Sequence, residues 1–132
     1  MIYMNKYGLI FILLFSGVYT ESFGDSCPSP KTIRDRKLSQ NYEWTVDENT
    51  TLQNLLSVKK LYAVRIMDQD AYVSCHYTTD KWPIKLDVTP VSGQCKSLPQ
   101  GDNWKNTESG QVVCQEKDVR KCEFTFECGQ KQ

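Results

Sequence analysis

Three runs of alternating apolar and polar residues constrain the fold of this chain more than any other feature. The runs cover residues 61–67, 71–79 and 81–89. Successive side chains of a β-strand point to opposite faces, so a period of two predicts strands with one buried and one exposed face. In the first run this pattern places Tyr62, Val64 and Ile66 together on the buried face. The short polar turns between the runs predict an antiparallel meander.

Further elements are predicted on both sides of the meander. Residues 42–46 alternate and are rich in β-forming side chains, which predicts a first strand. Residues 47–51 suit a helix N-terminus, and Leu52, Leu55 and Leu56 follow at helical spacing, which predicts a helix of about two turns with its leucines on the sheet. Residues 111–115 and 121–128 are expected to form the last two strands, joined as a hairpin by a charged turn.

The segments between these elements carry weaker signals. Residues 31–40 are charged and weakly periodic, so we expect a loop or an edge segment. Residues 90–110 read as a long polar loop held down by Cys95. The prediction is an α+β fold that is mainly antiparallel β-sheet, a meander of about six strands with one short helix.

The first 24 residues have the pattern of a signal peptide. Lys6 precedes an apolar run, and Ser22 and Gly24 fit the −3 and −1 positions of a signal-peptidase site. The apolar run is shorter than the roughly 20 residues that span a bilayer. We therefore expect a signal peptide at residues 1–24, a single small domain at 25–132, and a secreted or periplasmic protein with no membrane span in its mature chain. The alternative is an uncleaved N-terminal anchor.

All six cysteines follow the predicted signal peptide, and an even number in a small exported chain is typical of disulfide bonds: Cys27, Cys75, Cys95, Cys114, Cys122 and Cys128. Cys122 and Cys128 would lie about 20 Å apart in one extended strand, too far to bond each other. We expect Cys114 to pair with Cys122 across the hairpin. The other two bridges are open among several pairings.

The titratable residues do not form a recognisable catalytic or metal site. Cys75 and His76 are neighbours in a strand, so their side chains point to opposite faces and the disulfide interpretation of Cys75 is favoured. His76 is the only histidine, and a metal site needs convergent partners. The residues 68–70 resemble the start of a calcium loop without its later ligands, and a hairpin turn is the ordinary interpretation. We therefore expect no cofactor, no metal and no enzymatic activity.

The charge balance bears on the class of partner. Sixteen basic and sixteen acidic residues cancel, which argues against nucleic acid as a partner. Asn49 begins a glycosylation sequon, which matters only in a eukaryotic secretory pathway.

Aromatic residues give the best indication of a binding surface. Trp82 lies before Pro83 at a predicted turn, and Trp104 lies in the predicted long loop. Tyr72 and His76 share the predicted polar face of the second meander strand. Large rings at such positions anchor protein or glycan ligands, so the candidate ligand-binding residues are Trp104, Trp82, Tyr72 and His76. The alternative is structural, with Trp44 and Trp82 closing the ends of the core and Trp104 covering a disulfide.

The chain also resembles a known family. An early Cys27-Pro28, Trp44 on the first strand, Cys75-His76-Tyr77, Trp104 and a late Cys122-Glu123-Phe124 follow the order found in small exported bacterial proteins of the domain-of-unknown-function 3757 type. Members occur in Gram-negative bacteria, including intracellular pathogens. The resemblance implies a periplasmic or secreted protein and supplies no catalytic residues.

The leading hypothesis is an exported, non-enzymatic binding protein that engages a protein or a cell-surface ligand through its loops. One alternative is a secreted protein inhibitor that blocks a hydrolase with the loop at residues 90–110. A second alternative is a small hydrolase that uses His76 or converging carboxylates.

Overall fold

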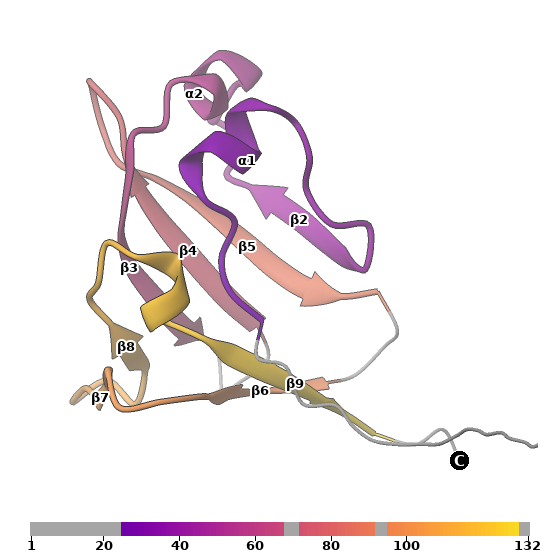
Figure 1. Cartoon of the computed structure of the whole chain (residues 1–132), viewed down its shortest axis with the longest axis vertical. Coiled ribbons are helices and arrows are strands. Elements are labelled where there is room, and N and C mark those ends of the chain that lie inside the picture. Colours follow the sequence, from indigo (N-terminus) through magenta and orange to yellow (C-terminus); the bar gives the residue numbers. More distant parts are fainter. Residues whose placement is uncertain (1–24, 68–71, 92–94, 130–132) are drawn as a thin grey trace, which may run out of the picture.

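The computed structural model describes residues 25–67, 72–91 and 95–129 (Figure 1). The signal peptide and the turn expected at residues 68–70 lie outside the described residues. The helical elements are α1 (Pro30–Arg34), α2 (Leu52–Leu56) and the 3-10 helix η2 (Val119–Lys121). The strands are β2 (Tyr42–Val46), β3 (Lys60–Met67), β4 (Tyr72–Thr78), β5 (Ile84–Pro90), β6 (Cys95–Pro99), β7 (Trp104–Asn106), β8 (Val112–Cys114) and β9 (Phe124–Cys128).

A six-stranded antiparallel sheet forms the body of the molecule. Its order is β2-β5-β4-β3-β8-β7, so the predicted meander β3-β4-β5 is confirmed at its centre. The predicted first strand, β2, extends the meander by pairing with β5. The fold class predicted from the sequence is therefore confirmed.

A second, two-stranded sheet pairs β6 with β9, and it corrects two predictions. The expected hairpin is wrong, because β8 pairs with β3 and β7 whereas β9 pairs with β6. The expected long loop is also wrong, since residues 90–110 contain both β6 and β7. The partner of β6 lies far along the chain, and the partner of β7 is a very short strand. Local alternation in the sequence therefore did not predict β6 or β7.

Helix α1 corrects the expectation of a loop or edge segment at residues 31–40. Ser29 caps the helix by accepting a hydrogen bond from the Thr32 N–H, and Pro30 occupies a first-turn position that needs no N–H donor. Ile33 is buried in the core. Pro30 thus begins a helix in place of the expected loop or edge segment.

Helix α2 was predicted, and its N-terminus is closed by a capping box. Thr51 accepts from the Asn54 N–H, and Asn54 Oδ1 accepts from the Thr51 N–H, at 3.1 and 2.9 Å. Leu55 packs against the core as expected. Leu52 does not, and 52% of its surface is exposed.

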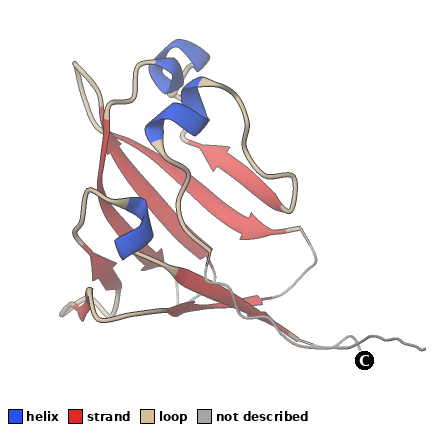
Figure 2. Cartoon of the chain, viewed as in Figure 1, coloured by secondary structure: helices blue, strands red, loops and turns tan. Residues whose placement is uncertain are grey.

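The core lies on one face of the large sheet. It combines the inner-facing side chains of β3, β4 and β5 with Ile33, Val58 and Phe124 from the segments that cover them. Figure 2 shows the helices on one side of the large sheet. This is the side that faces the β6–β9 pair. The opposite face of the sheet, which we call the outer face, carries alternating polar residues of β4 and β5, such as His76 and Lys85.

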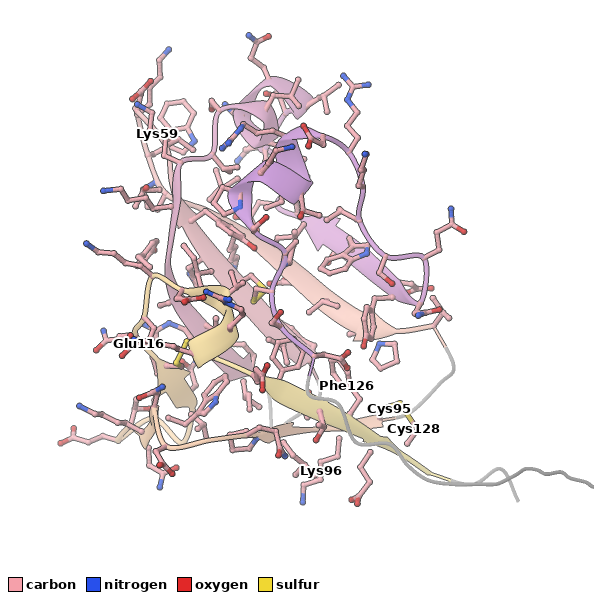
Figure 3. All side chains as sticks on the ribbon, in the orientation of Figure 1. Lys59, Cys95, Lys96, Glu116, Phe126 and Cys128 are labelled. Atoms are coloured by element: carbon pink, nitrogen blue, oxygen red, sulfur yellow. A yellow bond between two sulfur atoms is a disulfide. The ribbon has the colours of Figure 1, made fainter. Side chains whose placement is uncertain are left out.

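All six cysteines form disulfides. The predicted Cys114–Cys122 bridge is confirmed, and the other two bridges are Cys27–Cys75 and Cys95–Cys128. Figure 3 shows Cys95 and Cys128 together at one end of the small sheet. Within the described part of the chain, no helix is long and apolar enough to cross a bilayer.

Candidate functional site

A β-bulge in β3 turns an aromatic ring out of the core. Leu61 is opposite Tyr77 and Ala63 is opposite His76, so Tyr62 is an extra residue with no partner of its own in the β4 register. The placement of Tyr62 on the buried face is therefore wrong, and 40% of its surface is exposed. The alternation is restored after the bulge, where Val64 is buried as predicted.

The outward Tyr62 ring rests against His76. Their ring centroids lie 5.8 Å apart with an interplanar angle of 72°, an edge-to-face arrangement. Partial burial of His76, together with the positive charges of Arg65 and Lys85, lowers the pKa of its imidazole from 6.5 to about 4, while Asp87 acts in the opposite direction. His76 is therefore a neutral ring at neutral pH.

Trp82 completes this surface from the turn between β4 and β5. Thr79 shapes the turn, because its Oγ1 donates to the Trp82 carbonyl at 2.6 Å and accepts from the N–H groups of Lys81 and Trp82 at 3.2 Å. An ion pair between Lys59 and Asp80 links the turn to the start of β3. With its backbone held in this way, Trp82 remains 52% exposed.

Tyr62 and Trp82 line one shallow hollow. Its volume is about 280 Å³, and its other lining residues are Thr78, Thr79, Lys81 and Pro83. We call Tyr62, His76, Trp82 and Pro83 the aromatic patch. Lys59, labelled in Figure 3, marks this end of the molecule, opposite the end that holds Cys95 and Cys128.

The polar residues beside the patch do not form a catalytic relay. Ser74 is opposite Asp87 and two residues from His76 on the outer face, a grouping that resembles a nucleophile, an acid and a base. However, Ser74 Oγ, His76 Nε2 and Asp87 Oδ1 are buried atoms without a hydrogen-bond partner in the part of the chain that the structure describes. A serine nucleophile needs a hydrogen bond to its base, so this geometry gives the hydrolase hypothesis no support.

A second hollow lies toward the β7–β8 edge. It has a volume of about 450 Å³ and combines Arg65 and Lys105 with Asp102 and Glu116. The two basic and two acidic side chains cancel, so the lining carries no net charge. Among the described residues there is also no group of three or more histidine, cysteine or acidic side chains that could hold a metal ion.

The structure separates the four candidate ligand-binding residues. Trp82 and His76 both contribute to the aromatic patch, joined by Tyr62. Tyr72 is half-buried on the face of β4 that carries His76, about 13 Å away along the strand. Trp104 is not a loop residue, because it lies in β7 opposite Cys114 and packs against the core.

The structural alternatives for the tryptophans have different outcomes. The Trp104 indole N–H donates to the carbonyls of Gln100 and Glu123, at 3.1 and 3.0 Å, which is a structural role. Trp44 packs against the core as the structural alternative expected. Trp82 does not close the core, since half of its surface is exposed.

Tyr62 was not among the candidate ligand-binding residues predicted from the sequence. The signal for the bulge at Tyr62 was present as the consecutive residues Ala63 and Val64, which interrupt the strict alternation of the run.

Comparisons with protein-family models, with curated proteins and with solved structures find no match to this chain.

Proposed function

We propose that this chain is an exported, non-enzymatic binding protein that engages a partner protein through the aromatic patch. The observation that carries the proposal is the exposure of Trp82 and Tyr62 side by side in one hollow, on backbone held by Thr79 and the β3 bulge. Tryptophan and tyrosine are enriched among the residues that dominate binding energy at protein interfaces, and a contiguous exposed apolar patch is often an interaction site.

The shape of the patch favours a protein over a glycan. The hollow of about 280 Å³ suits one apolar side chain of a partner. A sugar needs several convergent hydrogen-bonding groups, and Thr79 Oγ1 is already used within its own turn, which leaves Thr78 and Lys81 as the polar side chains of the lining. The rings therefore supply most of the available contact.

The inhibitor alternative has less support than the aromatic patch. It required a protruding loop at residues 90–110, where the structure places β6 and β7. Trp104, the residue expected to act from that loop, packs against the core instead.

Capture of partners by wild-type and variant proteins tests the proposal. The oxidised mature protein, immobilised, is compared with Trp82→Ala, Tyr62→Ala and the control Val91→Ser, whose side chain is 55% exposed and outside the patch. We expect a partner that wild type and Val91→Ser retain and that the Trp82 variant binds at least about tenfold more weakly, because a central aromatic anchor contributes about 2 kcal/mol or more. Equal binding by all four proteins, or binding of a glycan through Trp82, would overturn it.

Export and family membership are part of the same proposal. Three disulfides support an oxidising compartment, as in secreted or periplasmic proteins and in the exported bacterial family that the chain resembles. N-terminal sequencing of the exported protein tests the export proposal, with cleavage after Gly24 as the expected result.

A further inference from the structure

Helix α1 ends in a conformation that normally requires glycine, and the residue there is Arg36. The Arg36 N–H donates to the Ile33 carbonyl and the Lys37 N–H to the Thr32 carbonyl, both at 3.0 Å, which is the Schellman pattern of a helix C-terminus. Arg36 has a φ of +59°, which lies in the left-handed region of backbone conformation. Residues other than glycine adopt this conformation only at a cost in free energy. An arginine at this position therefore works against the stability of the fold.

Arg36 lies at the edge of an apolar cavity. The cavity has a volume of about 220 Å³ between the two helices and the large sheet, and its other lining residues are Ile33, Leu38, Leu52, Leu55 and Leu86. Among these described lining residues, Arg36 is the single charged group and the others are aliphatic. Leu52, which α2 contributes to this lining, is 52% exposed.

Among the described residues, none pairs with the Arg36 guanidinium. The nearest acidic residue in sequence, Asp35, pairs with Lys31. Arg34 instead donates to the Val58 carbonyl at 2.7 Å. Across residues 25–67, 72–91 and 95–129, the Arg36 side chain forms no hydrogen bond or ion pair.

We infer that this cavity binds a small carboxylic acid with an aliphatic tail. The tail would replace water against the leucines, and the carboxylate would pair with the Arg36 guanidinium, whose planar donors match a carboxylate. A cavity of about 220 Å³ lies between one that holds benzene and those that hold drug-sized ligands, so the acid has about ten non-hydrogen atoms. Octanoate is a suitable probe.

Arg36→Gly separates ligand binding from stability. Glycine suits the left-handed conformation, so we expect this variant to melt at the same temperature as wild type or a few degrees higher. We expect its affinity for octanoate, measured by isothermal titration calorimetry, to fall about tenfold or more, because a hydrogen bond to a charged group is lost. Lys37→Ala, which changes the neighbouring exposed cation outside the cavity, serves as the matched control and is expected to bind as wild type does.

Octanol and Leu52→Ser test the apolar half of the site. Octanol has the tail without the carboxylate, so we expect it to bind wild type and Arg36→Gly equally. We expect Leu52→Ser to weaken both ligands. Octanoate binding that is undetectable at millimolar concentration, or that is unchanged by Arg36→Gly, would overturn the inference.

Discussion

His76 shows how one side chain on the outer face responds to its neighbours. The folded protein holds the pKa of this imidazole at about 4, compared with 6.5 for an unperturbed histidine. Between these two values the unfolded chain binds a proton that the folded chain does not. Stability therefore falls as the pH drops from 6.5 to about 4, and His76 contributes no pH dependence above or below that window.

We expect this effect to cost about 1–3 kcal/mol of unfolding free energy between pH 7 and pH 4, reduced from the full shift because the ring is partly exposed. Urea denaturation at a series of pH values measures it. His76→Gln has no proton to bind in this range and is the control, expected to lose less stability over the same interval. An NMR titration that places the His76 pKa near 6.5 would contradict the prediction.

At the scale of elements, the β3 bulge is the feature that exposes the aromatic patch. Tyr62 is the extra residue, and the flanking pairs Leu61–Tyr77 and Ala63–His76 would follow each other directly in a regular ladder. Deletion of Tyr62 therefore leaves every other side chain of β3 on its present face. A bulge of this kind is a local device and not a requirement of the sheet.

We expect the protein with Tyr62 deleted to fold, with an unfolding free energy within about 1 kcal/mol of wild type, because no buried side chain is lost. Its His76 loses an aromatic neighbour, so the imidazole pKa should rise toward 6.5. Thermal unfolding and an NMR titration measure the two effects. Collapse of the fold would show that the bulge sets the register of β3.

The elements also show what the sequence can predict. The β3-β4-β5 meander, β2 and α2 follow from local periodicity and capping residues, and all were predicted. The partners of β8 and β9 depend on contacts between distant segments, which alternation cannot specify. Trp82 and His76 were predicted as site residues from their local setting. Tyr62, which joins them, was missed because one extra residue reverses the face of a strand position.

At the scale of the whole molecule, the disulfides connect separate parts of the fold. Cys27–Cys75 joins the N-terminal segment to the centre of the large sheet. Cys114–Cys122 joins the large sheet to the segment that enters β9, and Cys95–Cys128 closes the small sheet. Each of the first two bridges therefore attaches a segment that covers the core to the large sheet. A domain of this size has only a marginally stable core, so this attachment matters for stability.

The two buried bridges allow a test of how this stabilisation arises. All four cysteines are at most 1% exposed, so replacing either pair with alanine removes similar buried volume. The pairs differ in sequence separation, 48 for Cys27–Cys75 and 8 for Cys114–Cys122. Because the longer loop restricts the unfolded chain more, we expect its loss to cost about 1–2 kcal/mol more in urea denaturation. Equal losses, or a larger loss for the short loop, would show that local packing around the bridges outweighs loop entropy in this fold.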